Sequence, residues 1–317
     1  MSQLSVSAPP ELNSHKAIDR VLNTLDQVVL GKPHELRLAL SCLLANGHLL
    51  IEDVPGVGKT TLAHALAATL GLHFTRIQFT SDMLPSDVIG VSILKQDTGE
   101  FELHKGPLFS QVVLGDEVNR ATPKTQSALL EAMEERQISI DGVTHTLPAP
   151  FFVIATQNPS EQVGTYPLPE SQMDRFLMRL SLGYPDRAFE RELLTGGDRR
   201  AALATLNAVL DAHRLSELQR RVHDVHVAEP LLDYVQNLVE FSRVDGTILN
   251  GISPRASLML LHAARAWAMV DHRDAVIPQD VQDVMGPVVD HRLTLRTSAD
   301  LDTTSAAEYL LGAVPIP

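Results

Sequence analysis

The chain has 317 residues, of which 44% are hydrophobic and 21% are charged. At about 150 residues per domain this length predicts two domains, and the apolar fraction excludes disorder as the main state of the chain. The 26 Lys and Arg residues against 39 Asp and Glu leave a net charge of −13, so the protein offers no basic platform for nucleic acid or for an anionic membrane. We therefore expect no nucleic-acid partner.

The start of the chain and its apolar runs bear on location. Residues 1–12 contain no basic segment followed by an apolar stretch, and no run approaches the roughly 20 apolar residues that span a bilayer. We therefore expect no membrane insertion and a cytoplasmic protein. The single cysteine, Cys42, excludes an intramolecular disulfide, and its apolar neighbours predict a core position.

The first half of the chain alternates helical and strand patterns. Residues 1–10 are rich in Ser and Pro and are predicted to be flexible. Short runs that are apolar throughout are typical of strands in a parallel sheet covered on both faces, so the alternation predicts an α/β domain. The predicted helices cover residues 14–29, 36–45, 60–70 and 123–135, the last capped by Thr122, and the predicted strands cover 48–52, 111–115 and 151–155.

Two further stretches complete the predicted organisation. Residues 91–103 alternate around a turn at Asp97-Thr98-Gly99 and predict a hairpin inserted in the first domain. After residue 185 we find only helical patterns, so we divide the chain into an α/β core at residues 1–184 and a smaller all-α domain at 185–317. The helices predicted in the second domain cover residues 203–210, 231–241, 256–270 and 278–289.

The strongest chemical signal is a glycine-rich loop between a predicted strand and a predicted helix. Backbone N–H groups that converge on phosphate oxygens need glycines so that the chain can approach closely. Lys59 would reach the β- and γ-phosphates, and the hydroxyl of Thr60 would bind Mg²⁺. Asp53 stands where the strict pattern has its first glycine. The predicted nucleotide-binding residues are Asp53, Val54, Pro55, Gly56, Val57, Gly58, Lys59, Thr60 and Thr61.

A pair of carboxylates follows the second predicted strand. Asp116 and Glu117 end the apolar run 112–114 at the carboxyl edge of the sheet, where ligands bind in open α/β folds. Because side chains alternate along a strand, the two acids should point in different directions. Asp116 is suited to hold Mg²⁺, and Glu117 is suited to polarise the water that attacks the γ-phosphate.

These two sites together resemble an AAA+ ATPase, and further segments resemble the MoxR family within that class. The resemblance runs from about Val28 to the end of the chain and implies a P-loop AAA+ core followed by a helical lid. The segments that carry it are residues 80–87 (TSDMLPSD), 115–121 (GDEVNRA), 129–135 (LLEAMEE), 155–159 (ATQNP), 173–179 (MDRFLMR) and 253–256 (SPRA).

The resemblance implies roles for four more residues. Asn158 matches the sensor 1 position, from which its amide would contact the lytic water or the γ-phosphate. Arg175 matches the arginine finger supplied to a neighbouring subunit, with Arg179, one helical turn further on, as the competing candidate. Arg255 matches sensor 2, and whether it serves its own nucleotide or a neighbour's stays open. The hairpin at residues 91–103 resembles the helix-2 insertion of this clade.

The resemblance also implies an activity and partners. It implies Mg²⁺-dependent hydrolysis of ATP in a ring, expected to be a hexamer, that remodels protein complexes as a chaperone does. The implied clients are proteins that carry a von Willebrand factor A domain. Two alternatives stay open: a magnesium-chelatase-like motor subunit, and a nucleotide-gated binding module with little turnover.

Overall fold

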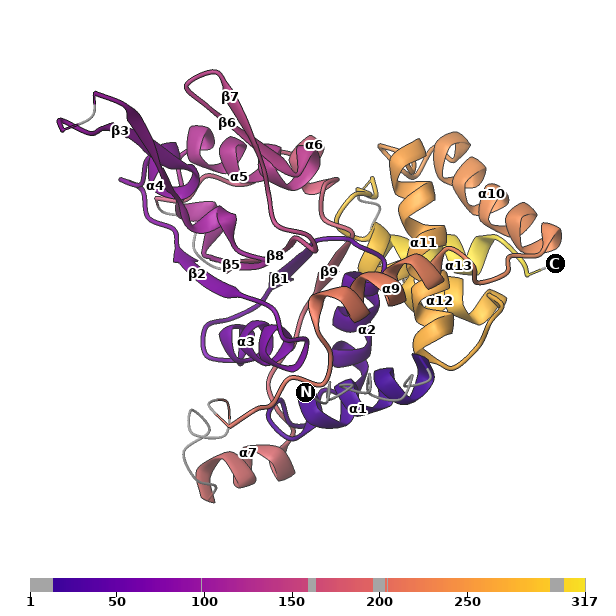
Figure 1. Cartoon of the computed structure of the whole chain (residues 1–317). Helices are drawn as coiled ribbons and strands as arrows, with labels where there is room; N and C mark the ends of the chain where they lie inside the picture. The colour runs from indigo at the N-terminus through magenta and orange to yellow at the C-terminus, as the bar shows by residue number, and fades with distance from the viewer. Residues whose placement is uncertain are drawn as a thin grey trace, which may run out of the picture.

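The computed structural model describes residues 14–97, 99–158, 164–195, 203, 205–296 and 305–316. The tail predicted at residues 1–10 lies outside the described residues. One sheet organises the first part of the molecule, and a group of helices beside it forms the second part (Figure 1).

The central sheet has five strands in the order β2-β5-β8-β1-β9, and every pairing is parallel. The predicted strands at residues 48–52, 111–115 and 151–155 are confirmed as the three inner strands. The two edge strands were not predicted. The bounds are β1 Leu49–Glu52, β2 Phe74–Gln78, β5 Val112–Asp116, β8 Phe152–Gln157 and β9 Met178–Leu180.

Both faces of the sheet are buried, which explains why the inner strands are apolar throughout. Leu49 and Ile51 point into one cluster with the first helices and the helical part, whereas Leu50 points into a second cluster on the opposite face. Because successive side chains of a strand alternate between faces, only an unbroken apolar run can serve both clusters.

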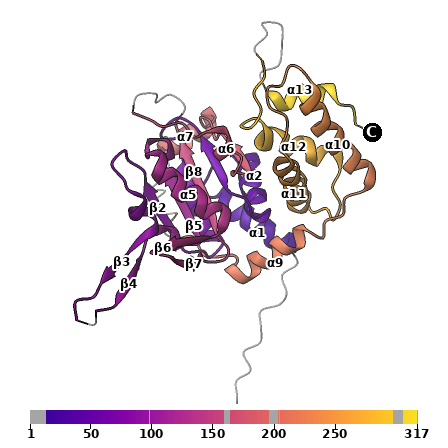
Figure 2. The same ribbon diagram turned by 90° about the horizontal axis from the view of Figure 1, so that it is seen from above.

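Among the described residues, helices α1 to α6 belong to the first part with this sheet, two hairpins extend from it, and α7 follows beyond residue 184. The helix start predicted at Thr122 is confirmed, since its side chain accepts from the backbone N–H of Thr125. The hairpin predicted at residues 91–103 is β3–β4, which projects from the core in Figure 2. The bounds are α1 Ser14–Asp26, α2 Pro33–Leu44, α3 Lys59–Thr69, α4 Pro85–Ile89, α5 Pro123–Glu135, α6 Glu170–Met173, α7 Arg187–Thr195, β3 Gly90–Leu94, β4 Phe101–Lys105, β6 Gln137–Ile140 and β7 Val143–Thr146.

The second part is helical, as predicted, and it packs against α1 and α2 through one continuous hydrophobic cluster. In the part of the chain that the structure describes, no helix is long and apolar enough to cross a membrane. The division at residue 184 stays a prediction. The bounds are α9 Ala212–Val222, α10 Glu229–Val244, α11 Pro254–Val270, α12 Pro278–Val289 and α13 Ala306–Ala313.

The helix predicted at residues 203–210 is wrong over residues 205–210, although Leu203 is helical. Residues 205–210 form a turn and irregular backbone, and the next helix, α9, begins only after Asp211. The N–H groups of Val209 and Leu210 donate to the carbonyl of Thr69 at the end of α3, so they are not available for helical hydrogen bonds. Asp211 then caps α9 by accepting from the N–H of Arg214 at 2.8 Å. The hydrogen bonds to the end of α3 therefore outweigh the local preference of these residues for a helix.

Candidate nucleotide-binding site and arginine cluster

The loop between β1 and α3 adopts a backbone that only glycine adopts readily. Gly56 and Gly58 have φ values of +90° and +101°, and a Cβ atom at either position would meet no atom within 4 Å. Packing therefore does not require glycine here, but the left-handed backbone does. No side chain caps the start of α3, whose N-cap is Gly58, so its first N–H groups have no cap and are suited to bind an anion.

Lys59 links this loop to the end of β8. Its buried Nζ donates to the carbonyl oxygen of Asp53 at 2.5 Å and to Oδ1 of Asn158 at 2.8 Å. The structure thus brings together two residues that lie 99 positions apart and that we selected separately. They border a pocket of about 340 Å³ that is lined by Pro55, Gly56, Gly58, Lys59, Thr60, Thr61, Arg76, Asp116, Glu117 and Asn158.

Asp116 ends β5 inside this pocket and is largely buried. Its Oδ1 accepts from the Thr156 hydroxyl at 2.6 Å, and its Oδ2 forms an ion pair with Arg76 at 2.6 Å. The ion pair offsets the cost of burying this carboxylate, since an unpaired buried charge would be costly. Arg76 comes from β2, which we did not predict.

Glu117 follows the end of β5, so strand alternation does not set its direction, and it lines the same pocket as Asp116. It has a positive φ of 55°, and its backbone N–H donates to the Thr156 hydroxyl at 3.0 Å. Its carboxylate accepts from Arg120 at 2.9 Å and is more exposed than that of Asp116. The strained backbone turns this acid toward the pocket that it lines.

The oxygen atoms of this pocket suit a magnesium ion. Mg²⁺ prefers carboxylate and hydroxyl oxygens and retains several of its waters. Thr60 and Asp116 both line the pocket. Asp116 Oδ1 accepts one hydrogen bond and retains a lone pair for a further ligand, whereas Oδ2 accepts two hydrogen bonds from Arg76. Thr60 and Asp116 would therefore hold the ion, and the ion would neutralise phosphate charge.

Asp53 does not line the pocket, although it occupies a position of the phosphate-loop motif. Its carboxylate accepts from Leu182 N and Gly183 N, each at 2.6 Å, and from the Ser181 hydroxyl at 3.1 Å. Burial raises the pKa of this carboxyl, but these hydrogen bonds and one from Val54 N outweigh that effect and lower the pKa overall. The residue joins the loop to the segment after β9. Val54 and Val57 also lie off the pocket, and Val57 packs on the core.

Arg175 and Arg255 meet at a different place, around Glu134 near the end of α5. Arg175 Nε lies 3.9 Å from Glu134 Oε2, and Arg255 Nη2 forms an ion pair with Glu134 Oε1. In the parallel register Leu49 of β1 pairs with Met178 of β9. Arg175 precedes this level, whereas Lys59 follows the far end of β1. The two arginines and the phosphate loop therefore lie at opposite edges of the sheet.

Arg179 is not one helical turn from Arg175, so that expectation is wrong. Helix α6 ends at Met173, and Arg179 lies within strand β9. Its Nη1 forms an ion pair with Glu52 Oε2 at 2.8 Å, and Gln157 donates to the other oxygen of that carboxylate at 3.0 Å. Arg179 thus pairs across the sheet within its own chain.

Sequence reasoning missed the partners of the selected residues. Arg76, Thr156 and Glu134 each contact a selected residue, yet each contact joins positions at least 39 residues apart. A carboxylate in a buried strand signals that some cation must lie nearby. Local spacing does not show which of the 26 Lys and Arg residues it is.

The site combines a parallel sheet, a glycine-rich turn at the start of a helix and an inner strand that ends in a carboxylate. These features together define a P-loop nucleotide-binding protein. Two family models agree: residues 48–178 match "ATPase family associated with various cellular activities (AAA)", and residues 240–309 match "AAA lid domain". The chain is thus an α/β AAA ATPase core followed by a helical lid, as we predicted.

Relatives place the chain more narrowly. It is 44% identical to YeaC of Bacillus subtilis, with 96% of each chain covered, and 42% identical to Chaperone MoxR1 of Mycobacterium tuberculosis, with 91% of this chain and 78% of the relative covered. A crystal structure from Cytophaga hutchinsonii, assigned as an ATPase, superposes with a TM-score of 0.85 at 38% identity over 96% of both chains. The chain belongs to the MoxR family of AAA+ ATPases, which implies that it binds ATP.

Proposed function

We propose that the protein hydrolyses ATP to ADP and phosphate in the pocket between β1, β5 and β8, with Mg²⁺ as cofactor. The observation that carries this proposal is that Lys59, Asp116, Glu117 and Asn158 line one pocket beside an open glycine turn. These side chains come from three different strand ends, and each belongs to a type that phosphoryl transfer requires.

Each residue has a distinct task in this proposal. Lys59 and the N–H groups at the start of α3 bind the phosphates, and Thr60 and Asp116 hold the ion. Glu117 orients and polarises a water, which attacks the γ-phosphorus while the bond to the β–γ bridging oxygen breaks. Asn158, whose Oδ1 now accepts from Lys59 at 2.8 Å, is placed to contact the γ-phosphate or that water.

The arginines complete the site of a neighbouring subunit. Arg175 and Arg255 lie at the edge of the sheet opposite to the phosphate loop of their own chain, which favours action in trans for both. A head-to-tail contact that presents one edge to the next subunit's pocket generates a ring when the rotation closes. We propose a hexamer, in which Arg175 is the finger that stabilises transition-state charge.

The proposed biological role is chaperone-like remodelling of protein complexes in the cytoplasm. Its support is the family relationship, which includes the relative named Chaperone MoxR1. The strands of the hairpin β3–β4 expose Val91, Ile93, Leu94 and Phe101, the last at 73%, and such exposed apolar side chains suit contact with a protein client. Proteins with a von Willebrand factor A domain are the proposed clients.

Steady-state Mg²⁺-ATPase activity per protomer, measured over a wide range of protein concentration, tests this proposal. We expect activity that rises with concentration as rings assemble and that is lost in Glu117→Gln. A flat, background-level rate in both proteins would contradict hydrolysis and favour the nucleotide-gated binding module. Activity that persists in Glu117→Gln would assign the water-activating role to another residue.

A further inference from the structure

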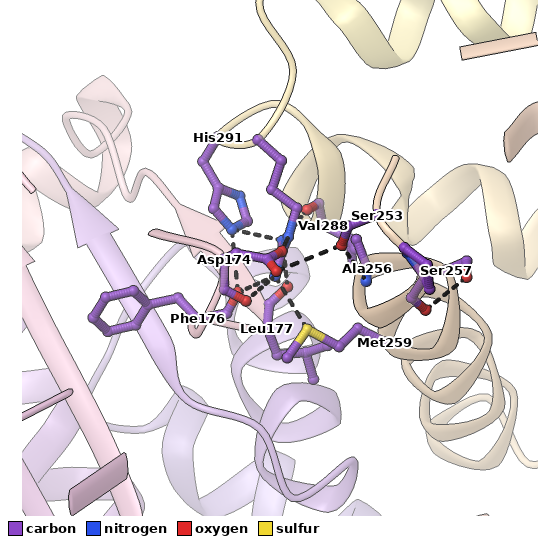
Figure 3. Close-up of polar contacts among 11 residues, drawn as sticks. Asp174, Phe176, Leu177, Ser253, Ala256, Ser257, Met259, Val288 and His291 are labelled. Atoms are coloured by element: carbon purple, nitrogen blue, oxygen red, sulfur yellow. Dashed lines mark hydrogen bonds and ion pairs between the residues drawn. The ribbon is translucent and has the colours of Figure 1, made fainter. Parts of the chain in front are cut away.

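The side chain of Arg292 is buried behind the segment that carries Arg175. Its side chain is 5% exposed and forms an ion pair with Asp174, from Nε to Oδ1, at 2.7 Å. It also donates to the carbonyl oxygens of Asp174 at 3.1 Å, Phe176 at 2.5 Å and Leu177 at 3.3 Å. Figure 3 shows these three residues of the core facing Met259, Val288 and His291 of the lid.

The guanidinium therefore fixes the backbone on both sides of Arg175 but leaves the Arg175 side chain outside. Arg292 follows α12, and it also donates to the Val288 carbonyl near the end of that helix. Its lid-side contacts include Met259 Sδ at 3.2 Å and His291 Nε2 at 2.6 Å. The position of the Arg175 backbone is thus tied to two helices of the lid, α11 and α12.

Asp174 extends the same connection to Arg255. Its other carboxylate oxygen, Oδ2, lies 3.5 Å from the hydroxyl of Ser253, the residue that caps α11 by accepting from Ala256 N at 3.0 Å. Arg255 lies two residues after that cap and reaches the same Glu134 carboxylate as Arg175. The ion pair between the buried Arg292 and the partly exposed Asp174 therefore lies between the two arginines and connects their backbones.

The chemistry of this pair demands arginine at position 292. A planar guanidinium has five N–H donors in a rigid fork, so one side chain can bond a carboxylate and several backbone carbonyls in different directions. A lysine would retain the charge, but its single ammonium cannot span acceptors on both α12 and the 174–177 segment. A charge this deeply buried is costly unless it is paired, and stability alone is often served as well by apolar residues.

We propose that Arg292 and Asp174 act as a positioning pair, which sets Arg175 and Arg255 for the neighbouring subunit's nucleotide and couples their placement to the lid. This inference rests on the proposed function, because it concerns how the proposed finger is held. Neither residue of the pair lines the pocket that we propose for the nucleotide of its own chain. A lid movement would reach the neighbouring site through this pair.

The test compares Arg292→Lys with Arg296→Lys, a matched change at an exposed arginine four residues further on. A misplacement of about 1 Å at a catalytic group can cost about 10²-fold in rate, so we expect kcat of Arg292→Lys to fall by about that factor. We expect its Kd for ATP and its circular dichroism to match the wild type. Arg296→Lys should match the wild type in every measurement.

Mixing experiments separate a positioning role from a structural one. Lys59→Ala protomers cannot bind ATP but retain both arginines, so we expect them to restore hydrolysis to Arg292→Lys protomers, which retain an intact pocket. Wild-type activity of Arg292→Lys alone, loss of its ATP binding, or failure of the mixture to regain activity would overturn the inference. If Arg292→Lys does not fold, Asp174→Asn replaces it in the test, because it removes the charge of the partner. The same results for activity, ATP binding and mixing would then support or overturn the inference.

The mixture of Arg175→Ala with Lys59→Ala separates this inference from the proposed function. If that mixture stays inactive, the proposal that Arg175 acts in trans is contradicted. If that mixture is active while Arg292→Lys alone hydrolyses ATP normally, only the positioning role fails.

Discussion

The two edges of the central sheet differ in what they hold. The carboxyl edge gathers an uncapped helix start, Lys59, Asp116, Glu117 and Asn158 around one pocket. The opposite edge gathers Arg175 and Arg255 on Glu134. In the proposed function, one edge supplies the groups that bind phosphate and activate water, and the other supplies the cations that stabilise transition-state charge.

In the proposed function, this difference means that a single chain would be an incomplete enzyme. Strand β1 separates the two edges, and both arginines engage a carboxylate of their own chain. Because Glu134 pairs with both, the cations are held together and retain some exposure, at 29% for the Arg175 side chain and 44% for that of Arg255. In the proposed ring, a second subunit brings the two edges together.

The largest expected effect comes from the carboxyl edge. Lys59→Ala should abolish measurable ATP binding, because it removes the cation that joins the loop to Asn158 and that would contact the phosphates. Isothermal titration calorimetry with Mg²⁺-ATP checks this, with Lys124→Ala as the control at an exposed lysine. Unchanged affinity would contradict the assignment of the phosphate loop.

The next effect distinguishes the two candidate fingers. Arg175→Ala should leave ATP binding intact and reduce hydrolysis by about 10³-fold or more, the range that a finger contributes. Arg179→Ala should have a much smaller effect, because Arg179 pairs with Glu52 inside its own chain at 2.8 Å. Turnover and binding of both variants decide the matter. A larger loss of hydrolysis in Arg179→Ala than in Arg175→Ala would assign the role of the finger to Arg179.

Acid should loosen the contact between β1 and α5, the helix that carries Glu134. His48 Nδ1 accepts from Val153 N at 3.0 Å and its Nε2 contacts the Met133 carbonyl at 3.2 Å, while burial lowers its pKa from 6.5 to about 4. The native state therefore binds fewer protons than the unfolded state between these values. Stability should fall as the pH drops from about 6.5 to about 4, by about 3 kcal/mol for this group.

Two measurements check this pH dependence. The denaturation midpoint should decrease steadily from pH 7 to pH 4.5. The imidazole of His48, followed by NMR in the folded protein, should stay neutral at pH 5. A titration of His48 near pH 6.5 would show that burial does not control its charge.

A smaller effect is expected at Asp53, where the sequence departs from the strict phosphate-loop pattern. Asp53→Ala would leave the N–H groups of Leu182 and Gly183 without their acceptor, which costs roughly 1–3 kcal/mol of stability. Urea denaturation checks this, with Asp97→Ala, at an exposed position, as the control. An unchanged midpoint would mean that Asp53 does not hold the loop to the segment after β9.

Much of the fold could be predicted because its inner elements bury both faces. Strands β1, β5 and β8 are continuous apolar runs, and helices α5 and α12 carry local start signals. The edge strands could not be found in the same way. Strand β2 alternates with Arg76 and other polar residues, and β9 has only three residues, so neither shows an apolar run.

The candidate site was predictable where spacing along the chain carries the chemistry. The loop 53–61 and the pair Asp116 and Glu117 are local patterns, and the structure brings the pair and most of the loop, but not Asp53, Val54 or Val57, to one pocket. The ion pairs were not predictable, since Arg76 with Asp116 and Arg292 with Asp174 join positions 40 and 118 residues apart. The sequence shows that a buried charge needs an oppositely charged partner, but only the three-dimensional structure shows which residue that partner is.

The central claim is that one chain supplies the phosphate loop and its neighbour supplies the arginines. The most direct measurement is the ATPase activity of Lys59→Ala and Arg175→Ala, each alone and then mixed in equal amounts under assembly conditions. Each variant alone should be inactive, and the mixture should regain up to about one quarter of the wild-type rate, since random head-to-tail assembly pairs an intact loop with an intact arginine at that share of interfaces. A mixture as inactive as its components would contradict the claim.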